Sequence, residues 1–439
     1  MADKSLRSWL EGKEIKVFCF ATLMLLLVAG VGLYLAQMIS GEGIPLWEGI
    51  RNIIVSRDAL ITDYFELAGY AAAFFNGALV VGIGLLLLCL EKVPFTGLTL
   101  AAIFINAGYG LWGKNPLNIL PVLLGTYLYA RLHRARLSRY IYTALFGTSL
   151  APLVTELIYL LPFDRWVNLL IAVLIGVFVG FTLPPLAMHT ASMHMGYNLY
   201  NVGFATGILA FVSVCILKSL GMESQSVLIW REGRPVWLIA GMCGYFLMTF
   251  FYGWYLEHWN IKKFIKIWRH PGRAVADFVL MDGPGATLMN MSTVGLVCVI
   301  YVCAVGGDFS GPVVGAILTA FGFSAFGAHL KNYLPVLTGV CLASLLPQYS
   351  LTTPGFLLAS AFAVGLAPIA GQFGPVAGVI AGLLHAVIVM CTSQLYGGLN
   401  LYNNGFSAGW VAIVMIPALE SFMHGFRARK KQKKEAKGK

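Results

Sequence analysis

Charged residues are scarce in this chain. They make up 11% of its 439 residues, whereas a soluble domain of ordinary composition carries about 25%. Hydrophobic residues make up 58% and the mean hydropathy is +0.78. Apolar runs long enough to cross a bilayer core of about 30 Å recur along the whole length. This composition leaves no segment for a soluble domain and predicts an integral membrane protein built as one membrane unit.

Several motifs that carry chemistry are missing as well. Gly113-Lys114-Asn115 lacks the glycine spacing and the Ser or Thr of a Walker A loop, so we predict no ATP-driven transport. HExxH does not occur. The eight cysteines form no CxxC pair that would indicate a disulfide framework or a zinc site. We therefore predict that the protein is not an enzyme and holds no metal or cofactor.

The positive charge that is present lies beside the apolar runs. The net charge is +11, and Lys and Arg gather in four segments, at 4–16, 131–139, 262–273 and 427–439. Basic segments that flank spans mark the cytoplasmic side, so we predict an integral protein of the bacterial cytoplasmic membrane with both termini in the cytoplasm. The first run, Val17–Met38, is too long for a signal-peptide core and is expected to stay as a span. The basic segments therefore predict contact with lipid rather than nucleic acid.

The apolar runs predict an all-α fold of about fourteen spans. The shorter ones (95–113, 116–131 and 332–347) are candidates for broken or re-entrant helices. Two prolines, Pro184 and Pro185, are expected to break the sixth span. The expected spans are 17–39, 66–90, 95–113, 116–131, 140–161, 166–187, 199–219, 236–256, 285–305, 310–328, 332–347, 353–371, 374–392 and 405–422.

Polar residues and glycines recur in the same order in the two halves of the chain, which predicts an internal duplication. A constant offset of 214 relates the two copies, and both contain Leu-Pro-Val-Leu, at Leu120 and at Leu334. The pairs at this offset include Asp63 with Asp277, Asn76 with Asn290, Gly97 with Gly311, Gly108 with Gly322 and Asn118 with Asn332.

Span counting predicts that the second copy is inverted in the membrane. Four spans precede 131–139, four more precede 262–273 and six precede the tail, so each half contains seven spans, an odd number. The predicted order is a cytoplasmic N-terminus (1–16), a first repeat (17–219), an external linker (220–235), a second, inverted repeat (236–422) and a basic cytoplasmic tail (423–439).

The paired polar residues are candidates for solute contact or ion coupling. Asn76, Asn290, Asn118 and Asn332 could bind solute or could hold helices together. Asp63 and Asp277 could couple to an ion or could cap helices and pair with arginines.

Glu156, which follows Pro152 in an apolar run, could be a protonation site because its approximate counterpart is Gln372. Alternatively, it could reach the external interface near Asp164 and Arg165. His189 and His194 lie five residues apart, which does not place them on one helical face. They could bind metal, relay protons or simply line a polar region.

A ten-residue segment occurs twice and gives the best candidate for a solute pathway. Asn198–Gly207 and Asn400–Gly409 share seven of ten residues. Their polar members, Asn198, Tyr200, Asn201, Asn400, Tyr402 and Asn403, offer neutral donors and acceptors. Each copy also contains GxxxG, so helix packing is the alternative role. We call these two segments the twin motif and expect the copies to face each other across a polar pathway.

The duplicated layout, in which Asn-Leu-Tyr-Asn-x-Gly-Phe closes each half, resembles an uncharacterised bacterial membrane-protein family of unknown function. A fainter similarity, carried by Pro94–Gly97 and Asp308–Gly311, is to the Asn-Pro-x-Ser/Thr-Gly segment of urea transporters, which also have inverted halves. This chain lacks the paired asparagines before that proline.

These observations predict a transporter or channel-like permease for a small polar solute, with its pathway between the inverted halves. A homo-oligomer is a candidate assembly. Two other hypotheses stay open, namely an intramembrane enzyme that uses Glu156 with His189 and His194, and a membrane scaffold that transports nothing.

Overall fold

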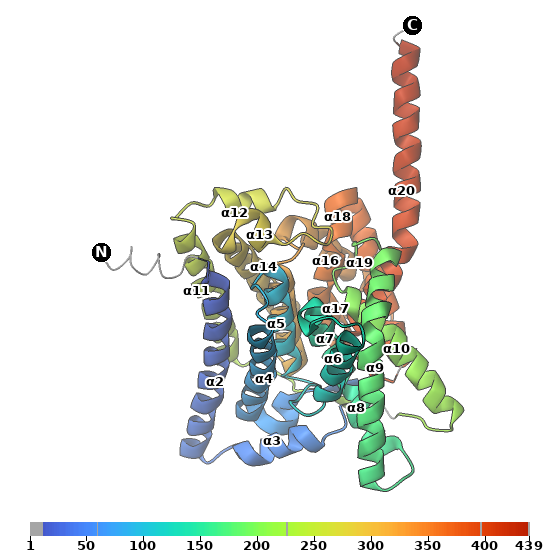
Figure 1. The fold of residues 1–439 in the computed structure, drawn as a ribbon. Coiled ribbons are helices and arrows are strands. Elements are labelled where there is room, and N and C mark those ends of the chain that lie inside the picture. The colour runs from blue at the N-terminus through green and yellow to red at the C-terminus, as the bar shows by residue number, and fades with distance from the viewer. Residues whose placement is uncertain (1–11, 59, 225–226, 396, 438–439) are drawn as a thin grey trace.

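The computed structural model describes residues 12–437 except 59, 225–226 and 396, and most of the described chain is helical (Figure 1). The first half contains α2 (Glu14–Ser40), α3 (Leu46–Val55), β1 (Leu60–Thr62), α4 (Tyr64–Leu90), α5 (Gly97–Tyr109), α6 (Leu120–Leu132), η1 (Leu137–Arg139), α7 (Ile141–Gly147), η2 (Thr148–Leu150), α8 (Ala151–Leu160), α9 (Arg165–Met193) and α10 (Asn201–Ser219). The second half contains β2 (Val227–Ile229), α11 (Val236–Leu256), α12 (Lys262–Ile267), α13 (Phe278–Asp282), α14 (Pro284–Val305), α15 (Gly311–Phe323), α16 (Leu330–Ala343), α17 (Pro354–Phe362), η3 (Ala363–Leu366), α18 (Ala367–Phe373), α19 (Pro375–Leu395) and α20 (Asn403–Lys437).

Helices of the two halves correspond in order, and the second half is inverted. In Figure 1, α2 runs down toward α3 at the lower end of the bundle, whereas its counterpart α11 runs up toward α12 at the upper end. We call these ends the α3 face and the α12 face. This arrangement confirms the predicted duplicated, all-α membrane fold.

All fourteen expected spans coincide with helical segments, but they differ in length. Within the described residues, ten helical segments are long and apolar enough to cross a membrane, when α7–η2–α8 and α17–η3–α18 are each taken as one segment. The other four, α5, α6, α15 and α16, contain 13 or 14 residues, or only about 20 Å of helix. Three of these short segments, α5, α6 and α16, fall in the spans expected to be broken or re-entrant, whereas the short α15 was not expected. Both α5 and α15 are half-helices continued by non-helical chain.

Hydrogen bonds from α4 and α14 stabilise the ends of the half-helices. Asn76 Nδ2 donates to the carbonyls of Gly110 and Lys114, both at 2.7 Å, just after α5 ends. Asn290 Nδ2 does the same after α15, with Ser324 at 2.7 Å and Ala328 at 2.8 Å. A carbonyl freed where a helix ends inside a membrane protein needs such a partner.

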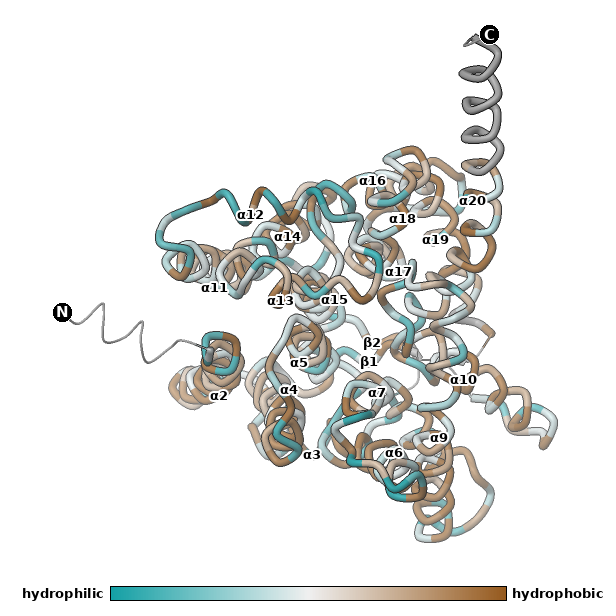
Figure 2. The backbone as a smooth tube through the Cα atoms, turned by 45° about the horizontal axis from the view of Figure 1, so that its top comes forward, coloured by the Kyte–Doolittle hydropathy of each residue, from teal (hydrophilic) through white to brown (hydrophobic). Residues whose placement is uncertain are grey.

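The described parts of the basic segments gather on one face. Arg136 forms an ion pair of 3.7 Å with Glu91 at the end of α4, and the segment at 262–273 includes α12. Figure 2 shows α12 as a hydrophilic segment against long helices that are mostly hydrophobic, and α20 extends beyond the bundle on this same face in Figure 1. One helix, α20, continues through the predicted tail boundary at 423 to Lys437.

The expected break at the two prolines is wrong. Pro184 and Pro185 lie inside α9, which continues to Met193. Proline at 184 cannot donate to the carbonyl of Gly180, four residues earlier. That carbonyl instead accepts a hydrogen bond of 2.9 Å from Thr126 Oγ1 in α6. A neighbouring helix thus satisfies the freed backbone group.

Candidate functional site

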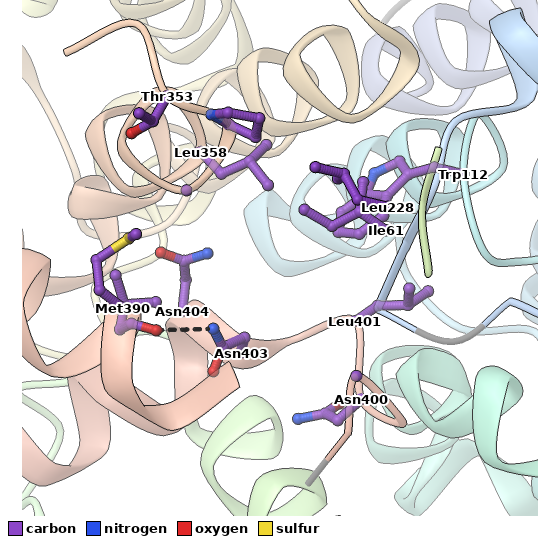
Figure 3. Close-up of a pocket in the computed structure, with 14 residues that line it drawn as sticks. Ile61, Trp112, Leu228, Thr353, Leu358, Met390, Asn400, Leu401, Asn403 and Asn404 are labelled. Carbon is purple, nitrogen blue, oxygen red and sulfur yellow. Dashed lines mark hydrogen bonds between the residues drawn. The ribbon is translucent and has the colours of Figure 1, made fainter. Parts of the chain in front are cut away.

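A cavity of about 260 Å³ lies between the two halves on the side of the α3 face (Figure 3). The β1–β2 ribbon provides part of its wall, because Ile61 and Leu228 are register partners in this parallel pair and both line the cavity. Trp112, just after the half-helix α5, adds an aromatic surface. The remaining lining residues belong to the second half and are Thr353, Pro354, Gly355, Leu358, Val389, Met390, Gly398, Asn400, Leu401, Asn403 and Asn404.

Three asparagines of the second twin motif line this cavity. Asn403 is oriented by two contacts with α19: its Nδ2 donates to Val389 O at 3.2 Å, and its Oδ1 accepts from Thr392 Oγ1 at 2.8 Å. Asn404 Oδ1 lies 3.1 Å from His385 Nε2. Asn400 Oδ1 accepts from the backbone of Tyr402 at 3.1 Å, while its buried Nδ2 has no protein partner. The site therefore offers neutral amide groups on an otherwise apolar wall.

None of the fourteen lining residues is charged. A charged solute would lose its hydration here without gaining an opposite charge, which is costly in a poorly hydrated interior. An uncharged solute loses less and can exchange hydrogen bonds with water for bonds to the asparagines. The chemistry of the wall therefore favours a small, neutral, polar ligand.

The corresponding segments on the α12 face are in direct contact. Ala274 N donates to Gly196 O at 3.0 Å, and Arg273 Nε donates to Met195 O at 2.6 Å. At the 214-residue offset, the counterpart of Ala274 on the α3 face is Leu60. Leu60 pairs with Val227 in the β1–β2 ribbon, whereas Ala274 contacts Gly196. The two faces of the inverted repeat thus have different contacts at equivalent places.

The two copies of the twin motif face each other, and they do so by close packing. A Cβ at Gly207 would lie 2.4 Å from the ring of Phe406, and one at Gly409 would lie 2.2 Å from the ring of Phe204. The rings of Tyr200 and Tyr402, both buried, are 5.0 Å apart at the centre of this crossing. GxxxG therefore brings α10 and α20 together, which is the packing role considered for the motif.

The polar residues of the first copy are engaged by protein. Asn201 Nδ2 donates to Ala187 O at 2.8 Å, and its Oδ1 contacts Thr190 Oγ1 at 2.8 Å and His194 Nε2 at 2.9 Å. Asn198 Nδ2 donates to Gly405 O in the second half at 3.2 Å. Of the ten predicted solute contacts, Asn400 and Asn403 line the cavity and the other eight do not.

Asn118 and Asn332 stabilise turns before α6 and α16. Asn118 Oδ1 accepts from Asn115 N at 2.8 Å, and Asn332 Oδ1 accepts from His329 N at 2.8 Å. Their amide groups donate to the carbonyls of Gly113 and Gly327 respectively. Like Asn76 and Asn290, these residues organise the broken segments rather than the cavity wall.

Asp63 and Asp277 cap half-helices of the opposite repeat. Asp63 Oδ1 accepts from Gly311 N at the start of α15, and the Asp277 carboxylate accepts from Gly97 N and Leu98 N at the start of α5. Burial raises the pKa of Asp63 to about 6, although hydrogen bonds from the backbone, including that of Arg231, oppose the shift. Both aspartates thus lie at structural junctions, which matches the capping role.

Glu156 lies in α8 near the α3 face and is paired. Its carboxylate accepts from Arg57 Nη2 at 3.1 Å and from Ser224 Oγ at 3.0 Å. Its approximate counterpart, Gln372, is exposed in α18. Glu156 therefore links α8 to the segments that flank the β1–β2 ribbon, and it does not line the cavity.

A nearby carboxyl, Asp58, was not singled out by the sequence. It is completely buried and contacts Tyr64 Oη at 2.8 Å, Thr155 Oγ1 at 3.0 Å and Asn118 Nδ2 at 3.2 Å. Burial raises its pKa to about 7, and the hydrogen bonds to the carboxylate oppose this only in part. No local pattern marks this residue, because its counterpart at the repeat offset is Gly272.

The histidines of the first repeat lie far from Glu156. Asn168, near the start of α9, donates to carbonyls at the end of α8, close to Glu156. His194 directly follows the C-terminal end of α9, and His189 is exposed. Because α9 contains 29 residues, these two regions are separated by roughly 40 Å of helix. Among the described residues, no group of three or more His, Cys, Asp or Glu side chains could hold a metal ion.

A protein-family model matches the chain twice, over residues 44–219 and 256–421, and is described as a protein of unknown function (DUF1576). The two matches begin at equivalent places, just before α3 and just before α12. The chain matches no curated protein and no solved structure.

Proposed function

The chain belongs to this family of membrane proteins of unknown function, and we propose that it is a permease for small, uncharged polar solutes. The observation that carries the proposal is the cavity between the inverted halves, with three asparagines, Thr353 and Trp112 on its wall and no charged residue. Its volume, about 260 Å³, suits a metabolite-sized ligand rather than a macromolecule.

The difference between the two faces supports alternating access as the mode of transport. In this conformation the cavity lies toward the α3 face, and the Ala274–Gly196 contact closes the equivalent place on the α12 face. Since the halves are inverted copies, exchanging these two arrangements would move the cavity toward the other side. The β1–β2 ribbon, which contributes Ile61 and Leu228, would then open and close with each cycle.

Uptake by proteoliposomes tests the proposal. Purified protein would be assayed with urea, acetamide and glycerol as neutral solutes, and with acetate and methylammonium as charged ones. We expect saturable uptake of at least one neutral solute and of neither ion. Leu358→Trp, which fills the cavity, should abolish this uptake, whereas Leu345→Trp at an exposed position should not.

Three outcomes oppose the proposal. Uptake of no neutral solute over protein-free liposomes would favour a scaffold, and uptake that Leu358→Trp leaves unchanged would exclude this cavity as the route. Chemical conversion of a solute by the reconstituted protein would instead favour the enzyme hypothesis. Glu156 and His194, which that hypothesis requires in one site, lie near opposite ends of α9.

A further inference from the structure

Lys114, in the break that follows half-helix α5, is completely buried. Its Nζ donates to Asn106 Oδ1 at 3.0 Å and lies 4.9 Å from the centre of the Tyr109 ring. Asn106 Nδ2 donates to the carbonyls of Ala102 and Leu145, which fixes the amide so that its oxygen faces the lysine. The ammonium position is therefore built, with one oxygen acceptor and one aromatic face.

A carboxylate partner is missing from this site. None of the ion pairs formed by the described residues includes Lys114. Taking an ammonium out of water without an opposite charge has a large desolvation cost. One hydrogen bond to an amide oxygen and one contact with an aromatic ring offset only part of that cost. An ionisable residue inside a membrane protein at such a cost is a functional-site candidate.

The second half shows that the fold does not need this lysine. Ala328 occupies the equivalent position, and Ala320 occupies that of Asn106. The backbone arrangement is nevertheless the same, because Asn290 bonds to the carbonyl of Ala328 as Asn76 bonds to that of Lys114. The lysine and its acceptor are thus an addition to one half only.

Tyr109 connects Lys114 to the cavity wall. Its hydroxyl donates to Leu401 O at 3.3 Å, and its ring lies edge-on to that of Trp112 with 5.2 Å between centroids. Leu401 and Trp112 both line the cavity. A change of charge at Lys114 would alter its attraction to the Tyr109 ring and, through that ring, the position of the wall.

We propose that Lys114 is the proton-binding residue of this permease, and that its charge state is transmitted to the cavity through Tyr109. The step transfers one proton between the lysine amine and water, and no other bond forms or breaks. Because Lys114 is buried behind Tyr109 and does not line the cavity, this exchange requires the Tyr109 ring to move aside on whichever side the cavity opens. This proposal rests on the proposed transport function and adds a proton as the coupled ion.

Few other titratable groups face this region. Tyr109 faces Lys114 from α5, and Tyr402 lies behind it with its ring centroid 5.7 Å from that of Tyr109. Asn76 of α4 and Thr148 of η2, which also contact the site, do not titrate. Two rival proton sites lie near this region: His385 of α19, which contacts Asn404 of the cavity wall, and the buried Asp58, which accepts from Asn118, four residues after Lys114.

A rival structural role is also defined. Lys114 follows the C-terminal end of α5, where the negative end of the helix dipole favours a cation. In that case its replacement would lower stability but would leave the cavity insensitive to pH. The response of the cavity to pH therefore separates this role from proton binding.

Cysteine labelling tests the proposal without an identified solute. In a cysteine-free background, Leu358→Cys reports on the cavity, and Ser350→Cys at an exposed site corrects for thiol ionisation. The purified protein would react with a maleimide from about pH 5 to about pH 9. We expect the rate ratio of the two sites to change by roughly threefold or more across this range, as the charge of one contact changes.

Two variants assign the pH effect. The ratio should become flat in Lys114→Met, which keeps the chain length without the charge. It should still change in His385→Gln and in Asp58→Asn. A flat ratio with the native lysine would overturn the proposal even if Lys114→Met failed to fold. Loss of the change in His385→Gln or in Asp58→Asn, or its persistence in Lys114→Met, would overturn it too. Absence of solute uptake would remove the transport function but not this labelling result.

Discussion

The carboxylate of Asp63 in the first half accepts a hydrogen bond of 3.0 Å from the backbone nitrogen of Gly311, at the start of a half-helix in the second half. In the reverse direction, the carboxylate of Asp277 in the second half accepts a hydrogen bond of 3.0 Å from the backbone nitrogen of Gly97 in the first half. Each repeat thus caps the broken helix of the other, and a helix N-terminus attracts negative charge. The two halves are interlocked at the level of single hydrogen bonds.

This interlock predicts equal effects of two distant substitutions. Asp63→Ala and Asp277→Ala should each lower the free energy of unfolding by about 3 kcal/mol, because buried backbone donors lose a charged acceptor. Thermal unfolding in detergent measures this. A loss in one variant with none in the other would contradict reciprocal capping.

The close packing of Gly311 against Asp63 can be tested with a matched pair of glycine-to-alanine substitutions. A Cβ at Gly311 would lie 2.5 Å from Asp63 Oδ1, so Gly311→Ala should lower the melting temperature markedly. Gly244→Ala is the control, because nothing lies within 4 Å of its added methyl group. Equal melting temperatures for the two variants would show that the cap tolerates displacement.

The twin motif predicts a separation between stability and affinity. Asn201→Ala leaves Thr190, His194 and a backbone carbonyl without their partner, so it should cost about 1–3 kcal/mol of stability. Asn404→Val, which copies Val202 of the first repeat, should instead weaken the apparent affinity for a transported solute about two- to tenfold. Melting temperature and uptake measured on the same preparations decide between these roles. Weakened affinity with unchanged stability in Asn201→Ala would instead indicate that Asn201 contacts the solute.

Asp58 predicts a pH-dependent stability. Its folded pKa is about 7, raised from 3.8 by burial. Between these values the folded state binds a proton that the unfolded state has lost, so stability should fall as the pH rises from about 4 to about 7. Asp58→Asn should remove about one linked proton, seen as a shallower fall of the melting temperature. Some dependence of stability on pH should remain in the Asp58→Asn variant, because burial also raises the pKa of Asp63, to about 6. Glu42→Gln, at an exposed residue, should leave the slope as it is.

The inverted repeat predicts which faces meet which side of the membrane. In a cysteine-free background, Ser350→Cys should react with an impermeant maleimide in intact cells, whereas Ser138→Cys should react only after permeabilisation. The physical basis is the basic segment at 131–139, which favours the cytoplasmic side. Equal labelling of both in intact cells would reverse or abolish the assigned orientation.

Local patterns in the sequence were sufficient to predict the membrane spans, but not the short helices α3, α12 and α13 or the β1–β2 ribbon. Hydropathy marked fourteen helical segments, and the paired Asp63/Asp277 and Asn76/Asn290 exposed the duplication before any coordinates. The same patterns failed at Pro184, because whether a proline breaks a helix depended on Thr126 in another helix. They also gave ten candidate solute contacts, of which only Asn400 and Asn403 line the cavity.

The sequence by itself determined the membrane class, the order of the helices and the odd number of segments per half, because these follow from composition and local periodicity. Only the tertiary structure decided which polar group meets which. Asp63 and Gly311 are 248 residues apart, and the burial of Lys114 beside Asn106 depends on where a non-helical turn folds back. Hydropathy is a property of a segment, whereas hydrogen bonds and cavities belong to pairs of segments brought together by packing, and the asymmetry between the two faces exists only in that packing.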